Sequence, residues 1–279
     1  MRTDNYVFLI GPARSGTKIL RDVIATHPKI DRVPFDINFI WKFCNEAVPH
    51  DELKIENYNL RSEKFIKDYL NRFKVSDDHY LIEKTVSNSL RVPYILKNFP
   101  NARFIFLHRN GLDVIESVMR QWKAPNNKGY LLKKAKVIPL RILIKYGFEF
   151  VKRTMHRESS NYYWGVNTPN MVNTELDRSL ESIVSQQWCY CIESMLNTKD
   201  LVPSQNLLIV RYEEMVENPK LVLSKALNFI NREFNIEDVE YSRISHENIG
   251  KSLEKFSEEQ LNKINSIIGS TVERINREM

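Results

Sequence analysis

Two glycines in the stretch Gly11–Lys18, GPARSGTK, are spaced as they are in phosphate-binding loops. The stretch follows the apolar run Tyr6–Ile10 and precedes a helix-like pattern. In a strand–loop–helix arrangement, backbone N–H groups and the helix dipole converge on one point, which favours an anion there. Glycines let the anion approach the backbone closely. The stretch therefore predicts a phosphate site, with polar side chains supplied by Arg14, Ser15, Thr17 and Lys18.

The order of residues after the second glycine separates this loop from that of magnesium-dependent kinases. The nucleotide-hydrolase pattern GxxxxGK[ST] requires lysine directly after the second glycine. Here Thr17 follows Gly16, and Lys18 comes one position later. The displacement disfavours a small-molecule kinase that uses ATP and magnesium, which we keep as the alternative function.

A second anion site is predicted around Arg109 and Ser117. Arg109 lies just past the apolar run Arg103–Leu107, and Ser117 follows eight residues later in a helical pattern. Ser117 falls off the apolar stripe of that helix, so its hydroxyl is free to face the loop. An arginine and a hydroxyl that converge on one anion form a phosphate clamp. The alternative role of Arg109 is a surface ion pair with Asp113.

Taken in this order, the stretches resemble the sulfotransferases that use 3′-phosphoadenosine 5′-phosphosulfate (PAPS). The first loop of that family commonly reads close to PRSGTT, and here it reads PARSGTK. The resemblance implies that PAPS is the co-substrate and that no metal is required. It also implies the donor-binding residues: Arg14, Ser15, Gly16, Thr17 and Lys18 around the 5′-phosphosulfate, and Arg109 and Ser117 at the 3′-phosphate. Without magnesium, Arg14 and Lys18 supply the positive charge.

Two later stretches extend the resemblance. HENIGKS resembles the family's C-terminal cofactor loop, often of the form IGKW, which implies that Gly250 and Lys251 contact the donor. Ser252 stands where the family has tryptophan. The stretch RYEEM resembles a family segment that we expect to support the sheet rather than to react.

Transfer of a sulfuryl group to a hydroxyl needs a base for the acceptor proton and cations around the sulfate. Lys84, directly past the apolar run Tyr80–Ile82, matches a family lysine that contacts the sulfuryl oxygens. Its alternative role is a surface pair with Glu83. Asp36 is the carboxylate nearest to the region where tyrosine and glycan sulfotransferases carry a catalytic Glu or His. The predicted catalytic residues are therefore Asp36, Lys84 and Arg14.

Asp36 has competing interpretations. An ordinary aspartate has a pKa near 4, so it needs a raised pKa or close geometry to act as a base. It could instead form an Asx turn that caps the next helix. His27, followed by Pro28, is the second candidate base.

The elements that position these residues alternate between strands and helices. Four short runs read as buried strands: Tyr6–Ile10, Tyr80–Ile82, Arg103–Leu107 and Leu207–Val210. The alternation predicts an α/β, P-loop-like three-layer fold with a mainly parallel central sheet flanked by helices. The loops after the first three runs should then be neighbours, since ligands bind beyond the carboxyl ends of such strands. We expect one sulfotransferase-like domain over 1–279, with an insertion or cap at about 125–181.

Composition excludes several classes of protein. The 279 residues contain no run of about 18 apolar residues, so we expect no membrane-spanning helix. Three cysteines form no even disulfide framework, and they favour a reducing, cytoplasmic location. The stacking motifs of nucleic-acid-binding modules are absent, so we expect no nucleic-acid partner.

The net charge of +6 is concentrated in residues 120–157, which contain eleven Lys or Arg residues and one acidic residue, Glu149. This basic segment has three interpretations: an acceptor groove for an acidic or sugar-rich chain, peripheral attachment to anionic lipid, and a solvated helix face. The leading function is sulfation of a hydroxyl on a carbohydrate or glycolipid acceptor. A non-enzymatic nucleotide-binding module is a further alternative. The sequence predicts no oligomeric state.

Overall fold

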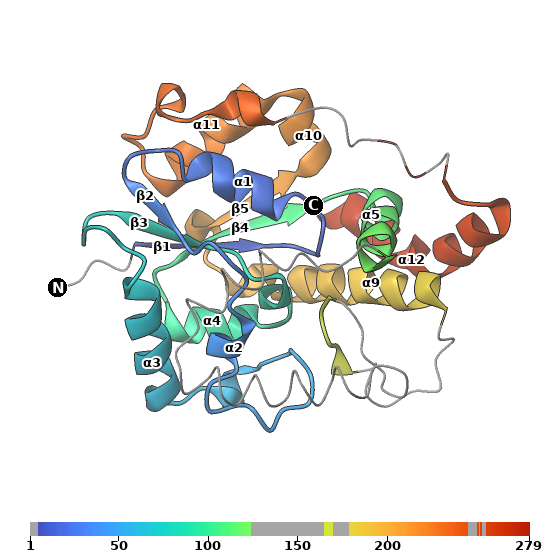
Figure 1. Ribbon diagram of the computed structural model, residues 1–279, viewed down its shortest axis with the longest axis horizontal. Helices are drawn as coiled ribbons and strands as arrows, with labels where there is room; N and C mark the ends of the chain where they lie inside the picture. The colour runs from blue at the N-terminus through green and yellow to red at the C-terminus, as the bar shows by residue number, and fades with distance from the viewer. Residues whose placement is uncertain (1–4, 124–164, 170–178, 245–249, 251, 253–254) are drawn as a thin grey trace.

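Five parallel strands form the central sheet of the computed structural model, in the order β2-β3-β1-β4-β5 (Figure 1). The structure describes residues 5–123, 165–169, 179–244, 250, 252 and 255–279. The strands are β1 (Tyr6–Ile10), β2 (Ile30–Arg32), β3 (Tyr80–Glu83), β4 (Arg103–His108) and β5 (Leu207–Arg211). The four predicted strands are confirmed, to within one residue at their ends. The short strand β2 was not predicted.

Helices cover both faces of the sheet, which confirms the three-layer α/β fold (Figure 1). One face carries α1 (Thr17–Ile24), α10 (Tyr212–Glu217) and α11 (Pro219–Ile230). The other face carries α4 (Val92–Asn98), α9 (Leu180–Thr198) and α12 (Glu258–Glu278). The remaining α-helices are α2 (Asn38–Trp41), α3 (Leu60–Asn71) and α5 (Gly111–Lys123). Short 3-10 helices are η1 (Ile55–Asn57), η2 (Val86–Leu90), η3 (Lys199–Leu201), η4 (Ser204–Asn206), η5 (Ile236–Asp238) and η6 (Tyr241–Arg243).

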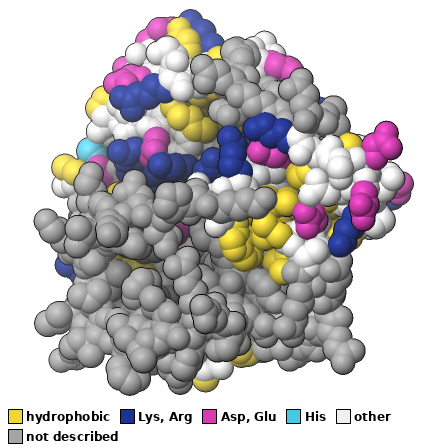
Figure 2. All heavy atoms as spheres, turned by 45° about the vertical axis from the view of Figure 1, so that its right-hand side comes forward, with side chains coloured by type: hydrophobic (Ala, Val, Ile, Leu, Met, Phe, Trp, Pro, Cys, Tyr) yellow, Lys and Arg dark blue, Asp and Glu magenta, His cyan; other side chains and the backbone are white. Residues whose placement is uncertain are grey.

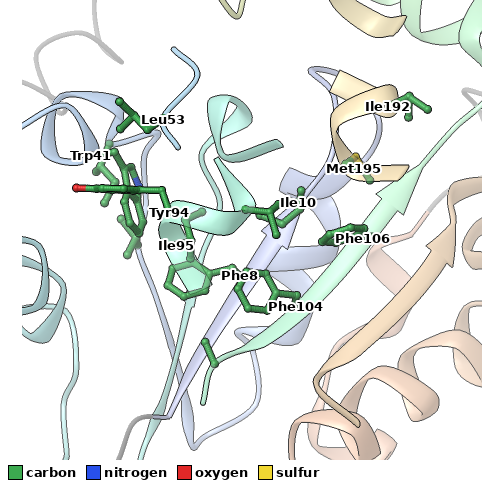
Figure 3. Packing of buried hydrophobic residues seen from close by; sticks show 14 of the residues in the cluster. Phe8, Ile10, Trp41, Leu53, Tyr94, Ile95, Phe104, Phe106, Ile192 and Met195 are labelled. Atoms are coloured by element: carbon green, nitrogen blue, oxygen red, sulfur yellow. The ribbon is translucent and has the colours of Figure 1, made fainter. Parts of the chain in front are cut away.

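The side chains of β1 alternate between two hydrophobic clusters, one on each face of the sheet. Val7 and Leu9 pack with α1 and α11, whereas Phe8 and Ile10 pack in the larger cluster on the opposite face (Figure 3). All four side chains are buried. A strand covered on both faces is apolar at every position, because each face must be removed from water. This explains the uninterrupted run YVFLI.

Helix α5 presents its predicted apolar stripe to the larger cluster, where Val114, Ile115, Val118 and Met119 are buried. The helix begins at Gly111, and the side chain of Asn110 accepts a hydrogen bond from the backbone N–H of Asp113 at 3.3 Å. Asn110 therefore caps the helix. The carboxylate of Asp113 has different partners, described below.

Most of the predicted cap and of the basic segment lies outside the described residues. Within that range the structure describes residues 165–169, and Asn167 there exchanges two hydrogen bonds with Asp51. In the part of the chain that is described, no helix is long and apolar enough to cross a membrane.

Candidate anion-binding and catalytic site

The predicted phosphate loop leaves β1 at the carboxyl edge of the sheet and packs tightly against its neighbours. A Cβ atom on Gly11 would lie 2.4 Å from the carbonyl oxygen of Leu107. Gly16 has a φ of +102°, and a Cβ atom there would lie 2.3 Å from the ring of Tyr212. Both glycines are therefore required by close packing and, at Gly16, by the left-handed backbone. The two glycines that define the motif also fix the loop against β4 and α10.

Arg14 joins the two predicted anion sites. Its Nε donates a hydrogen bond to Ser117 Oγ at 3.0 Å, and its carbonyl oxygen accepts one from Arg109 Nη1 at 3.3 Å. Arg120 Nη2 also lies 3.5 Å from Ser117 Oγ. Ser117 faces the loop, as its place off the apolar stripe predicts. Groups from the loop and from the start of α5 thus form one cluster.

Positive charge is concentrated in this cluster. The pKa of Arg14 lies below its ordinary value because its guanidinium is desolvated and lies near the cations of Arg120 and Arg109. Glu116 pairs with Arg120 at 3.5 Å and offsets part of this charge. The face toward which the strands point carries a band of Lys and Arg side chains beside a hydrophobic patch (Figure 2). A bound anion would stabilise such a cluster through charge-assisted hydrogen bonds.

Arg109 is buried and held from two sides. Its guanidinium lies 4.4 Å from the ring centroid of Tyr212, and its Nη2 lies 3.5 Å from Asp113 Oδ2. The alternative ion pair with Asp113 is therefore present, but inside the protein rather than on its surface. Tyr212 was predicted only to support the sheet. The Tyr212 ring packs against both Gly16 and Arg109. The RYEEM stretch, which begins at the last residue of β5, is the sequence signal that could have indicated this role.

Gly250 and Ser252 of the HENIGKS stretch contact the start of α5 through their backbone N–H groups. The N–H groups of Gly250 and Ser252 donate to the carboxylate of Asp113 at 3.0 and 3.3 Å. Gly250 thus lies beside the Arg109–Asp113 ion pair, and its contact with the donor stays a prediction. Lys251 lies outside the described residues.

Three further residues of the first loop differ in their surroundings. The Ser15 hydroxyl is buried and donates to the carbonyl oxygen of Pro12 at 2.7 Å. Thr17 is buried and Lys18 is exposed in the first turn of α1. Lys18 is therefore available to an anion at the loop.

Lys84 and Asp36 form an ion pair at the end of β3. Lys84 Nζ lies 3.0 Å from Asp36 Oδ1 and 3.3 Å from Oδ2. Asp36 Oδ2 also accepts a hydrogen bond from the backbone N–H of Val86 at 3.3 Å. Lys84 thus pairs with Asp36 rather than with Glu83, whose carboxylate is buried among other partners. The two predicted catalytic residues are in direct contact although 48 positions separate them.

His27 is remote from this site. It follows α1, which runs from the anion loop back toward the starting ends of the strands. Its ring packs against the Phe234 ring in a tilted arrangement, with 4.0 Å between the ring centroids, and its Nε2 lies 3.7 Å from Asp238 Oδ2. Burial lowers its pKa below the ordinary value. These contacts assign His27 to packing.

An apolar hollow lies between the anion loop and the residues after Lys84. Pro12 and Ala13 line it from the loop, and Val86 lines it from the end of β3. The other lining side chains are mainly apolar: Val114, Val118, Gly165, Val166, Val184, Gln187, Trp188 and Cys191. The loops after β1 and β3 are therefore neighbours, as the fold predicts.

The known proteins that this chain resembles are sulfotransferases. Residues 6–137 match the model of the sulfotransferase family, and no curated protein matches the chain. A sulfotransferase from Alicyclobacillus acidocaldarius aligns with a TM-score of 0.55 at 15% identity, over 99% of this chain and 96% of that one. The sulfotransferase domain from the curacin biosynthetic pathway gives 0.51 at 17% identity, over 96% and 99%. Mouse sulfotransferase SULT7A1, complexed with PAP, gives 0.50 at 15% identity, over 96% and 84%.

The family match contains the first loop, Asp36, Lys84 and the Arg109–Ser117 stretch. The structural likeness extends over nearly all of the chain. Residues 6–137 of this chain are therefore similar to the sulfotransferase family, and the chain has the fold of the sulfotransferase structures.

Proposed function

We propose that this protein transfers a sulfuryl group from PAPS to a hydroxyl group by in-line, metal-independent transfer. The observation that carries the proposal is the contact of Arg14 with Ser117 and Arg109, which brings two predicted phosphate sites together. PAPS carries one phosphate at each end of its ribose, so adjacent anion sites fit it. The loop Gly11–Lys18 would hold the 5′-phosphosulfate, and Arg109, Ser117 and Gly250 would hold the 3′-phosphate end.

The Lys84–Asp36 pair supports an assignment of the chemistry. The acceptor oxygen forms a bond to sulfur while the bond from sulfur to the 5′-phosphate oxygen breaks, and adenosine 3′,5′-bisphosphate leaves. Asp36 accepts the hydroxyl proton, while Lys84 and Arg14 stabilise the negative charge that develops on the sulfate and the leaving phosphate. Asp36 is one-third exposed, which leaves it within reach of an acceptor.

Ligand-induced stabilisation tests the donor. Adenosine 3′,5′-bisphosphate should raise the melting temperature of the protein in the presence of a chelator, whereas ATP with magnesium should not. The family match and the displaced Lys18 disfavour the kinase alternative. A shift with ATP and magnesium alone would overturn the sulfotransferase proposal. Nucleotide binding without any transfer of labelled sulfate to cell extracts would favour the binding module.

We infer a carbohydrate or glycolipid as the acceptor, and the basic segment 120–157 favours the glycolipid, because attachment to anionic lipid would bring the protein to a lipid-linked acceptor. Attachment to anionic lipid through residues 120–157 and a cytoplasmic location are parts of the same proposal.

A labelled-donor screen tests the acceptor class. The protein is incubated with sulfur-35 PAPS and either a lipid extract or a polar glycan fraction. Label should enter the lipid extract and be released in a water-soluble product by mild glycosidase treatment. Label found only in the glycan fraction would exclude the glycolipid. An Arg109→Ala variant, which lacks the second anion site, controls for transfer that does not depend on the protein.

A further inference from the structure

We propose that Glu83 is a positioning residue that holds the Lys84–Asp36 pair in its reactive arrangement, an inference that rests on the proposed function. Glu83 is the last residue of β3 and pairs in register with Phe8 of the neighbouring strand. It directly precedes Lys84. Its side chain is fully buried, so it cannot itself meet an acceptor.

The carboxylate of Glu83 connects the two segments that carry the pair. One oxygen accepts a hydrogen bond from the hydroxyl of Thr85 at 2.5 Å. The same hydroxyl oxygen accepts a hydrogen bond from the backbone N–H of Ile37 at 2.9 Å. Ile37 follows Asp36 in the chain. The relay from Glu83 through Thr85 therefore fixes the backbone next to Asp36.

The second carboxylate oxygen of Glu83 holds the other side of the pair. It accepts a hydrogen bond from Asn88 Nδ2 at 2.5 Å. Asn88 lies in η2, whose first residue, Val86, donates its N–H to Asp36. Glu83 thus links the end of β3, the helix η2 and the loop at Asp36, three segments whose relative placement sets the distance from Lys84 to Asp36.

The cost of burying this carboxylate argues for a role beyond packing. Burial without an ion-pair partner disfavours the charged form. The charged groups that face Glu83 are Asp36, Lys84 and Arg91, and burial raises its pKa to about 7. The Thr85 O–H and the Asn88 N–H both donate to Glu83, so these hydrogen bonds fit the ionised carboxylate. Below pH 7 the carboxyl group gains a proton, and one of these donors loses its acceptor.

The main test compares Glu83→Gln and Thr85→Val with the wild type in a sulfate-transfer assay. Glutamine keeps the shape but offers only one acceptor atom, and valine removes the relay to Ile37. We expect kcat to fall about tenfold or more in both variants, because misplaced reacting groups lose their orientation. The affinity for adenosine 3′,5′-bisphosphate should change less than about twofold, because the residues proposed to bind this nucleotide are not altered.

The dependence of kcat on pH distinguishes a positioning role of Glu83 from a role in the stability of the fold alone. Wild-type kcat should fall as the pH drops through about 7, where Glu83 becomes protonated. Glu83→Gln should lack this fall, because its side chain does not titrate. Thr85→Ser, which keeps the hydroxyl, should restore most of the kcat lost in Thr85→Val.

Glu193→Gln is the matched control. Glu193 accepts hydrogen bonds from the Thr271 hydroxyl and from Arg274, between α9 and α12 and away from the site. It should lower stability without changing kcat or the pH profile. The same pattern in Glu83→Gln would overturn the proposal.

A crystal structure of Glu83→Gln tests the positioning without any assay. We expect the Lys84 Nζ to Asp36 Oδ1 distance to lengthen from 3.0 Å. An unchanged distance would refute positioning even if the protein is a sulfotransferase. If the distance lengthens in Glu83→Gln but the wild-type protein transfers no sulfate, the positioning role stands and the proposed function is refuted. If Glu83→Gln does not fold, Thr85→Val takes its place in both measurements.

Discussion

Gly16 of the first loop has two roles: it adopts a left-handed backbone conformation, and it permits a close approach by a neighbouring side chain. Gly16 provides a left-handed backbone, and it also leaves room for the ring of Tyr212, which in turn lies against Arg109. The anion loop and the second anion site are therefore coupled through one aromatic side chain. A change at Gly16 should disturb both.

Gly16→Ala tests this coupling. We expect a loss of about 1–3 kcal/mol in the free energy of unfolding, because the new methyl group strains the backbone and displaces the Tyr212 ring. Binding of adenosine 3′,5′-bisphosphate, measured by calorimetry, should be lost as well. Gly269→Ala is the control, since nothing lies within 4 Å of the added Cβ atom in α12. It should stabilise the helix by up to about 1 kcal/mol and leave binding unchanged. Normal binding in Gly16→Ala would contradict the coupling.

Ser117→Ala isolates the bridge between the two anion sites. Ser117 Oγ accepts hydrogen bonds from Arg14 and Arg120. Its loss removes one ligand for the 3′-phosphate and frees Arg14 to change its position. The dissociation constant of adenosine 3′,5′-bisphosphate should rise about tenfold, as for a hydrogen bond to a charged group. Ser224→Ala, which removes a helix hydroxyl that donates only to the Lys220 carbonyl, should leave it unchanged.

The sequence predicted the orientation of a side chain well where a motif and the helical periodicity agreed. Ser117 stood off an apolar stripe and does face Arg14. The Lys84–Asp36 pair could not be read from spacing, because it depends on how the loop after β2 lies beside η2. The sequence indicated Glu83 only as a neighbour of Lys84. Its burial and its hydrogen bonds to the residues after β3 produce no periodic pattern in the sequence.

Helices and strands were predictable in proportion to their apolar patterns. Strands β1 and β4 are runs of buried residues and were found nearly to their ends. Strand β2 has three residues, of which only Ile30 is buried, so it carries no alternation or run that could reveal it. It forms through pairing with β3 at the edge of the sheet, which is a tertiary effect.

The start of α5 joins elements that lie far apart in the chain. Asp113 contacts Arg109 within its own segment and the N–H groups of Gly250 and Ser252 from the C-terminal loop. Because Asn110 performs the capping, the Asp113 carboxylate is left to hold that loop. This contact joins the start of α5 to Gly250 and Ser252, and we expect it to hold them in place for the donor.

Asp113→Asn tests this connection. An amide retains one acceptor atom where the carboxylate offers two, so one of the two N–H groups loses its partner. We expect the affinity for adenosine 3′,5′-bisphosphate to fall about fivefold to tenfold in calorimetry, with a smaller loss of stability. Glu116→Gln is the control on the same helix, because Glu116 pairs with Arg120 and Lys255 and makes no contact with Gly250 or Ser252 in the described residues. Equal losses in both variants would show that charge alone matters.

The site as a whole is assembled from segments that enter from both ends of the chain. The first loop, the end of β3, the start of α5, and Gly250 with Ser252 meet at one edge of the sheet. The hydrophobic clusters on the two faces of the sheet contain alternate residues of the same strands. Unfolding of the strands would therefore expose both clusters to water at once. We therefore expect one cooperative unit over the described fold.

Calorimetric unfolding tests this expectation at the scale of the whole molecule. The protein should unfold in a single transition, and adenosine 3′,5′-bisphosphate at 100 times its dissociation constant should stabilise it by about 2.7 kcal/mol. The whole transition should move to higher temperature, because the ligand binds only when the distant segments are together. A transition that splits, with only one part shifted by the nucleotide, would show that the two faces unfold independently. Arg109→Ala should retain the single transition and lose most of the shift.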